Sequence, residues 1–484
     1  MAHRLDNTDS LVGQASACLR PLPMTHRPTA HPVSSDLFLA GAAEAKITPP
    51  VGLPLLGPQA PGTGVHDDLF ARALVLSDGR ERVALVCLDL VGLDFRLTDD
   101  LRQAIRERTG IHASLVNCSH THSAPFTIPW SYQGWDDFER HGSAWRAELV
   151  TTVARTVAKA AAALRPAALS SGRETVRIGL NRRSVASSGV VMQPNAGGPT
   201  VGWVDVLRVD EANGEPLAVL LSHAAHPVVV HGASSLISAD YPGAATAVVR
   251  ERLGEGVVAL FAQGCGANIN AEPLRGGFEA ARRAGEVLGE AAVRAAAAAA
   301  PIPPSPLRAS VLRLSLPLQE YPSRPACEEA LAQARAALTA AQADEAAAPV
   351  HLWTLRDHVL CLEDLLARTQ SGRTAHLRFE ITALALGEHW CLLALTHEAF
   401  CEYQLWLQGV SPCRDNMVWA YTNGCESYLP TDESLALGPA AGYEAAPSPV
   451  IAAGLCYRAR LAPRLGLEGQ VKEALRRALA ALSP

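Results

Sequence analysis

Apolar and polar positions along the chain follow two periods, one typical of β-strands and one typical of helices. Three stretches combine two β-rich apolar runs with a short turn, and we predict a β-hairpin for each, at residues 72–90, 204–227 and 377–400. The first hairpin turns at Asp78-Gly79 and the second at Asn213-Gly214. Such dipeptides favour two-residue hairpin turns.

Apolar residues spaced three and four apart predict helices between and after these hairpins. Thr98 is expected to cap the first helix, which carries Leu101 and Ile105 on one face and stops at Gly110. The remaining predicted elements are helices at 143–164, 278–299 and 467–482, a helical hairpin at 323–369, and buried strands at 113–120 and 256–266. Together these elements predict a mixed α/β fold with a β-sheet core and surrounding helices.

The chain is expected to fold as one domain. Residues 1–36 lack the continuous apolar core of a secretory signal, and we expect them to be a disordered N-terminal extension. Residues 37–484 are predicted to form a single domain in which the helical hairpin at 323–369 is an insertion that shapes the substrate site. No apolar stretch is long enough and polar-free enough to cross a bilayer, so we expect no membrane insertion.

Composition and charge exclude several classes of partner. The 484 residues are 48% hydrophobic and carry a formal net charge of −6. Because the chain has no cluster of lysines and arginines, we expect neither nucleic acid nor an anionic membrane surface as a partner. Eleven cysteines without a repeated spacing or a CxxC pair are typical of reduced thiols, which predicts a cytoplasmic location. The sequence leaves the oligomeric state open.

Polar residues collect where the predicted strands end, which is where α/β folds hold catalytic side chains. The stretch NCSHTHSAP, at 117–125, places His120 and His122 two positions apart, so both imidazoles face one side of an extended chain. Both could bind a metal, or one could bind it while the other acts as an acid or base. His226, at the end of a later strand, is a candidate third ligand for a catalytic zinc. Nearby His223 is more typical of a core histidine.

No HExxH sequence is present, which excludes the zincin arrangement. Six other motifs follow one another along the chain: HSAP (122–125), GLNRR (179–183), AAHPVVV (224–230) with SADYPG (238–243), FAQGCGANIN (261–270), THEAF (396–400) and YTNGCESYLP (421–430). In this order they resemble the catalytic domain of the neutral, non-lysosomal ceramidases and their bacterial relatives, from Leu37 to Glu444.

The resemblance implies a zinc-dependent amidase with a ceramidase-like catalytic domain. It implies four zinc ligands, which are His120, His226, Glu398 and Tyr428. It implies two further catalytic residues, His122 beside the bound water as the proton shuttle and Tyr443 in the wall of the site. Substrate contacts are predicted for Arg182, Asn268 and Asn270.

The predicted reaction is hydrolysis of the C–N amide bond of an N-acyl compound, ceramide-like or smaller, through a zinc-activated water. The expected partner is therefore a small-molecule or lipid-like amide. Two alternatives remain: the same site hydrolyses an ester or lactone, or the chain is a non-catalytic protein that kept the fold and the zinc. A thiol-dependent enzyme that uses Cys265 is a third reading, although a small residue in a tight turn is the more ordinary interpretation.

The chain departs from the family pattern at several positions. His397 replaces the glycine that precedes the ligand Glu398, and Asn270 stands where ceramidases carry a serine, which removes a serine nucleophile. We expect no C-terminal β-sandwich domain after the catalytic motifs. Asp240, at a strand end, is a candidate partner that orients a histidine. Without the resemblance, Glu398 would be interpreted as a helix cap and Tyr428 as a packed aromatic residue.

Overall fold

The computed structural model describes residues 38–369, 375–448, 457 and 461–482. The predicted disordered extension at 1–36 lies outside the described residues. The division of the chain into domains stays a prediction.

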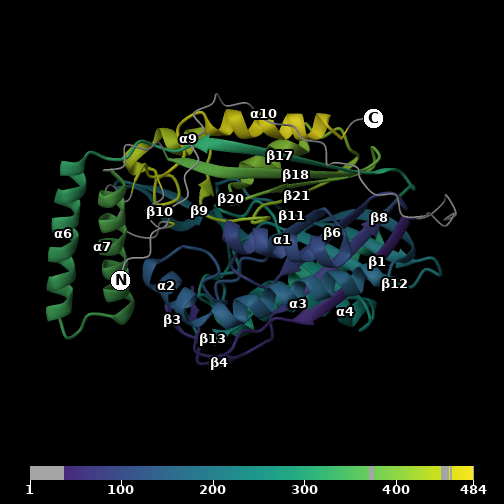
Figure 1. Ribbon diagram of the computed structural model, residues 1–484, viewed down its shortest axis with the longest axis horizontal. Coiled ribbons are helices and arrows are strands. Elements are labelled where there is room, and N and C mark those ends of the chain that lie inside the picture. The colour runs from purple at the N-terminus through teal and green to yellow at the C-terminus, as the bar shows by residue number, and fades with distance from the viewer. Residues whose placement is uncertain (1–37, 370–374, 449–456, 458–460, 483–484) are drawn as a thin grey trace.

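A nine-stranded sheet is the larger of two sheets at the centre of the fold (Figure 1). Its strands run in the order β14-β12-β11-β8-β1-β5-β6-β7, with β16 paired to β8. Their bounds are Phe38–Lys46 (β1), Phe70–Ser77 (β5), Arg82–Leu88 (β6), Ala113–Cys118 (β7), Arg165–Thr175 (β8), Trp203–Glu211 (β11), Pro216–His223 (β12), Val258–Gln263 (β14) and Ala300–Ile302 (β16). Strands β6 and β7 are parallel, as are β12 and β14.

The smaller sheet has four strands in the order β17-β18-β19-β21, and its last two are parallel. Their bounds are Leu307–Pro317 (β17), His376–Leu386 (β18), Trp390–Leu395 (β19) and Asp415–Trp419 (β21). Short strands form further pairs and a three-stranded group: Pro54–Leu55 (β2), Ala60–Pro61 (β3), Gly64–Val65 (β4), Gly179–Ala186 (β9), Gly189–Asn195 (β10), Leu236–Ile237 (β13), Ile269–Ala271 (β15), Glu398–Ala399 (β20) and Tyr428–Leu429 (β22).

Helices cover the outer faces of the two sheets (Figure 1). The larger sheet packs against α3 (Ser143–Ala162), α4 (Asp240–Leu253) and α5 (Phe278–Ala297), and the smaller sheet packs against α10 (Leu467–Ala480). Helices α6 and α7 pack against each other and stand at the edge of the molecule in Figure 1. The remaining bounds are Phe95–Thr109 (α1), Tyr132–His141 (α2), Arg324–Ala343 (α6), Pro349–Thr369 (α7), Cys401–Gln408 (α8) and Asp432–Ala436 (α9).

The strands are apolar on both faces because each face is covered. In β5, Leu74 belongs to a buried cluster that also contains Leu384 and Trp419 of the smaller sheet. The alternate residues Ala73 and Val75 belong to the cluster that includes residues of α3. Since successive side chains of a strand point to opposite faces, the two sheets pack face to face and the helices lie outside them.

The structure confirms the predicted mixed α/β fold and the three predicted hairpins. Strands β5 and β6, β11 and β12, and β18 and β19 each pair in antiparallel register. The predicted cap of the first helix was wrong. Helix α1 begins earlier, because Asp94 accepts a hydrogen bond from the Leu97 N–H at 2.9 Å and so occupies the cap position. Gly110 ends α1 in the left-handed conformation, as predicted, with φ of 68°.

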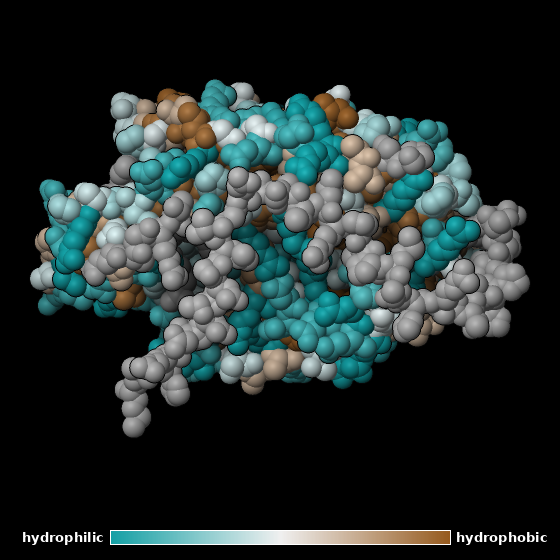
Figure 2. All heavy atoms as spheres, turned by 45° about the horizontal axis from the view of Figure 1, so that its top comes forward, coloured by the Kyte–Doolittle hydropathy of each residue, from teal (hydrophilic) through white to brown (hydrophobic). Residues whose placement is uncertain are grey.

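No helix among the described residues is both long enough and apolar enough to span a membrane. The face in Figure 2 is mostly hydrophilic, and its apolar side chains lie in small separate groups.

Asn117, near the end of β7, ties the ends of three strands together. Its side-chain amide donates hydrogen bonds to the carbonyls of Gln263 at 3.2 Å and Ala420 at 2.7 Å. Its oxygen accepts from the Gln263 N–H at 2.8 Å. The residue is fully buried, so these bonds satisfy groups that water cannot reach. They hold the carboxyl ends of β7, β14 and β21 side by side.

Candidate metal centre

Three side chains with metal-binding chemistry come from the carboxyl ends of three strands. His120 follows β7, His226 follows β12, and Glu398 follows β19. The His226 backbone is fixed beside β15, because its N–H donates to the Ile269 carbonyl at 2.8 Å. His120 has a φ of 69°, in the left-handed region that few non-glycine residues adopt. Such strain commonly marks functional positions.

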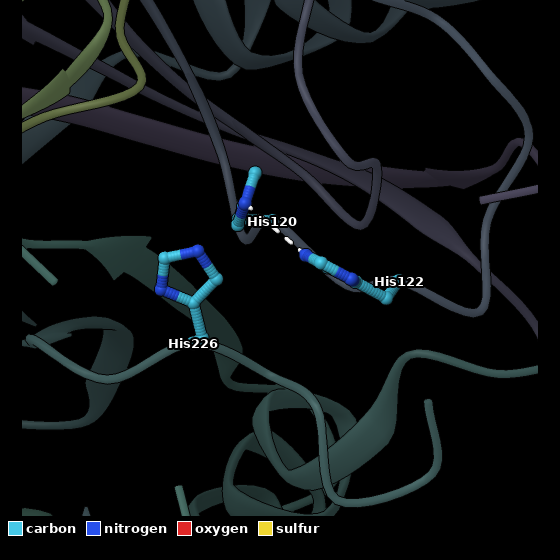
Figure 3. A group of neighbouring side chains, drawn as sticks. All are labelled: His120, His122 and His226. Atoms are coloured by element: carbon cyan, nitrogen blue, oxygen red, sulfur yellow. Dashed lines mark hydrogen bonds between the residues drawn. The ribbon is translucent and has the colours of Figure 1, made fainter. Parts of the chain in front are cut away.

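The polar atoms of these three residues converge on one buried point. Glu398 Oε2 lies 3.2 Å from His226 Nε2 and 3.4 Å from His120 Nε2. The three side chains are at most 2% exposed. In Figure 3 the ring of His226 is seen face-on and that of His120 edge-on, in agreement with an angle of 85° between the two planes.

The other ring nitrogens identify which atoms carry the protons. Nδ1 of His120 faces the Val91 carbonyl, and Nδ1 of His226 faces the Gly266 carbonyl at 2.8 Å. Burial lowers the pKa of His120 to about 3 and that of His226 well below its usual value, so both rings are neutral. A neutral ring that donates Nδ1–H to a carbonyl leaves Nε2 unprotonated. Two nitrogen lone pairs and a carboxylate oxygen therefore face one another.

This arrangement fits a metal ion. Acceptor atoms packed at such distances repel one another unless a cation lies between them. Two ligand atoms bound to zinc at about 2.0–2.1 Å in tetrahedral geometry lie roughly 3.3 Å apart, which agrees with the observed separations of 3.2 and 3.4 Å. A cation would also compensate the negative charge of the buried Glu398 carboxylate. The two histidines that contact this carboxylate, His120 and His226, are neutral and cannot do so.

Two tyrosines hold the Glu398 carboxylate. The Tyr457 hydroxyl donates to Oε1, and the Tyr421 hydroxyl donates to Oε2 at 3.4 Å. Neither tyrosine has a role predicted from the sequence. Tyr421 is the first residue of the YTNGCESYLP motif, so the motif contained a signal for it, whereas no motif contains Tyr457.

His122 completes a group of three imidazoles whose ligand atoms all lie within 4.8 Å of one another (Figure 3). Its Nε2 lies 3.3 Å from His120 Nε2. Its Nδ1 lies 2.9 Å from Nδ1 of His231, a residue without a predicted role. Burial lowers the pKa of His122 well below its usual value and that of His231 to about 4. Both rings are neutral near pH 7.

Aromatic rings line one side of the centre. Tyr428 pairs with Glu398 in a parallel bridge between β22 and β20. Its ring lies 5.8 Å from that of Tyr443 and 5.9 Å from that of Trp130, measured between centroids. Burial raises the pKa of both tyrosines above its usual value, so each is a neutral phenol. A phenolate at Tyr428 would require a nearby cation.

Arg182 is a buried cation with an unused donor. Its Nε donates to Glu444 at 3.2 Å, and its Nη1 donates to Asn270 Oδ1 at 3.2 Å. Its Nη2 has no hydrogen-bond partner among the described residues. The guanidinium carbon lies 5.6 Å from the centroid of the Tyr443 ring. The predicted substrate residues Arg182 and Asn270 therefore contact each other, and the guanidinium lies against Tyr443.

Two other residues with roles predicted from the sequence, Asn268 and Asp240, form hydrogen bonds with other groups of the protein. The Asn268 amide nitrogen donates to Glu402 at 2.8 Å, and its oxygen accepts from the Cys401 N–H at 2.9 Å, at the start of α8. Asp240, the candidate partner that orients a histidine, makes its hydrogen bonds to backbone groups. Its carboxylate accepts from the backbone N–H groups of Val230 at 2.9 Å and Tyr241 at 2.6 Å.

His397 and Cys265 have structural surroundings. His397 has a φ of 72°, in the left-handed region that favours glycine, the residue that the family resemblance implies here. Its ring accepts from the Glu426 N–H at 3.1 Å and donates to the Arg378 carbonyl at 2.7 Å, away from the centre. Burial raises the pKa of the Cys265 thiol above its usual value, which opposes the thiolate that a nucleophilic role requires.

Comparisons with known proteins agree with the motifs. Residues 38–270 match the sequence model of the family described as neutral/alkaline non-lysosomal ceramidase, N-terminal. The crystal structure of neutral ceramidase from Pseudomonas aeruginosa is similar at a TM-score of 0.64 and 18% identity, over 93% of this chain and 75% of that one. A structure described as ceramidase complexed with C2 gives 0.63 and 17%, over 92% and 76%. The predicted resemblance to the neutral ceramidases is confirmed, and the chain has their fold.

We predict that purified protein binds one zinc ion per chain and that His120→Ala abolishes this binding, because the variant removes one of the three converging acceptors. Metal content after dialysis, together with calorimetric titration of zinc, measures the effect. His223→Asn is the matched control. His223 is also buried, but its Nδ1 faces the Trp203 carbonyl at 2.8 Å, a contact that the asparagine amide can replace. Zinc binding by His120→Ala at wild-type affinity would refute the site.

Proposed function

We propose that this chain is a zinc-dependent hydrolase that cleaves the C–N amide bond of an N-acyl compound, ceramide-like or smaller. The observation that carries the proposal is the convergence of His120 Nε2, His226 Nε2 and Glu398 Oε2 on one buried point. We assign the zinc to these three residues, with Tyr428 as the fourth ligand that the family resemblance implies. Zinc held there would polarise a carbonyl as a Lewis acid and lower the pKa of water toward about 7.

His122 is the proposed proton shuttle. Its neutral ring can take a proton from the attacking water, and it can then give that proton to the leaving amine. Nε2 is the nitrogen that would do so, because it lies on the side of the metal-binding atoms, 3.3 Å from His120 Nε2. Tyr443 is the second proposed catalytic residue. As a neutral phenol it can donate a hydrogen bond to the oxygen on which negative charge develops.

Arg182 is the proposed substrate anchor. A buried, charged N–H without an acceptor is costly, so the site favours a ligand that supplies an oxygen to Nη2. An amide or ester carbonyl and a hydroxyl all meet this requirement. The choice of an amide is supported by the similar folds, since both reported structures are ceramidases and one is described as complexed with C2.

We predict that the zinc-loaded protein hydrolyses a short-chain ceramide faster than an O-acyl ester with the same acyl chain. Activity should disappear with a chelator, return with added zinc, and withstand a thiol-alkylating agent. Product release is measured by chromatography with matched substrate concentrations. Turnover of the ester alone would favour the ester or lactone alternative. Zinc binding without turnover of either substrate would favour a non-catalytic protein, and loss of activity on alkylation alone would favour Cys265.

We predict that His122→Ala keeps stoichiometric zinc but lowers kcat by about 10²–10⁴-fold, the range typical of a lost acid–base group. Metal analysis and steady-state kinetics on the same preparation measure both quantities. If His122→Ala loses the zinc as His120→Ala does, then His122 is a ligand and the shuttle assignment fails.

We predict that Arg182→Lys lowers kcat/KM by about 10–100-fold, because a lysine cannot reproduce the fork of a guanidinium that bonds several oxygens. Arg183→Lys is the matched control, since Arg183 donates to Glu444 at 2.6 Å and to the Ala441 carbonyl at 2.8 Å. If both variants lose activity equally, the effect lies in the shared Glu444 contact and not in a substrate contact. Thermal melts of both variants verify that they fold.

A further inference from the structure

His231 lies beside the candidate metal centre but outside its ligand set. It follows His226 by five residues, and its ring centroid lies 4.9 Å from that of His122. The two Nδ1 atoms are 2.9 Å apart, a hydrogen-bond distance. In Figure 3 a dashed line joins one ring nitrogen of His122, Nε2, to His120. The other ring nitrogen of His122, Nδ1, contacts His231.

A hydrogen bond between two ring nitrogens needs one proton, and its direction determines what His122 presents to the centre. If His231 donated, the single proton of neutral His122 would lie on Nε2. That N–H would point at His120 Nε2, 3.3 Å away, and would compete for the lone pair that a metal ion needs. If His122 donates from Nδ1, its own Nε2 lone pair faces the centre. Only the second direction agrees with a metal bound to His120.

Hydrogen bonds hold the backbone on both sides of this contact. The Gly57 N–H donates to the His122 carbonyl at 2.7 Å. A Cβ atom at Gly57 would lie 3.1 Å from His231 Nδ1 and 2.9 Å from the His122 carbonyl oxygen. Any larger residue at this position would therefore crowd the two histidines. On the other side, the Asp240 carboxylate accepts from the N–H of Val230, the residue before His231. The contact is therefore constrained from two elements far apart in sequence.

We propose that His231 is a positioning residue, which accepts the Nδ1–H of His122 and thereby keeps His122 Nε2 unprotonated and directed at the metal centre. The inference rests on the proposed metal hydrolase and extends it to a residue outside the ligand set. It holds whether His122 is the proton shuttle or a ligand, because both roles need the same tautomer. Histidines at metal sites are commonly held by such an acceptor on their second ring nitrogen.

Three substitutions at His231 test the direction and position of this hydrogen bond. The amide of His231→Asn places an acceptor oxygen where Nδ1 lies, the longer side chain of His231→Gln places it elsewhere, and His231→Leu removes it. At saturating zinc we expect His231→Leu to lose about 10–100-fold in kcat with little change in KM. We expect His231→Asn to restore most of that loss and His231→Gln to restore little.

Equal kcat for His231→Leu and wild type would overturn the inference, as would equal recovery by His231→Asn and His231→Gln, because a contact that only fills space does not distinguish the two amides. A second readout does not depend on activity. In ¹H–¹⁵N spectra of the ring nitrogens of the zinc-loaded protein, His122 should be protonated at Nδ1 in the wild type and lose this single state in His231→Leu. Protonation at Nε2 in the wild type would also overturn it. If zinc binds but no substrate is turned over, the hydrolase proposal fails while the spectra still decide the role of His231.

Discussion

Two backbone carbonyls set the chemistry of the candidate centre. The carbonyls of Val91 and Gly266 accept hydrogen bonds from Nδ1 of His120 and His226, respectively. The Nε2 lone pairs of both histidines are therefore left facing the Glu398 carboxylate. Without a cation, this packing of acceptors is unfavourable, and burial prevents protonation of the rings from relieving it. Val91 follows the end of β6 at Leu88, and Gly266 follows the end of β14 at Gln263, so both carbonyls lie in turns that leave a strand of the large sheet. The fold thus prepares a position for a positive charge.

The same strand ends bring the other groups of the site together. Asn117 fastens three strand ends through buried hydrogen bonds. Backbones in the left-handed region recur around the centre, at His120, His397 and Tyr421. Each such conformation costs about 1–3 kcal/mol for a non-glycine residue and persists only where neighbouring contacts enforce it. The left-handed conformation turns the chain sharply after a strand, and the side chains of His120 and Tyr421 contact Glu398.

The sequence predicted much of the fold, because periodic apolar runs correspond to strands and helices that are buried along their length. The start of α1 was missed because Asp94, the true cap, lies before the apolar pattern begins. The sequence motifs indicated His120, His226 and Glu398 as metal ligands. The contact between His122 and His231 was not predictable, because the two residues are 109 positions apart and no sequence motif indicates that they meet. The Tyr457 contact with Glu398 was missed for the same reason.

Diffraction from zinc-soaked crystals, recorded on both sides of the zinc absorption edge, would locate the metal ion. We expect one anomalous peak per chain within about 2.0–2.2 Å of His120 Nε2, His226 Nε2 and Glu398 Oε2. That peak would also reveal whether Tyr428 or His122 takes the fourth position. The absence of a peak at this point in fully soaked crystals, or a peak held by other residues alone, would show that these three residues do not form a zinc site.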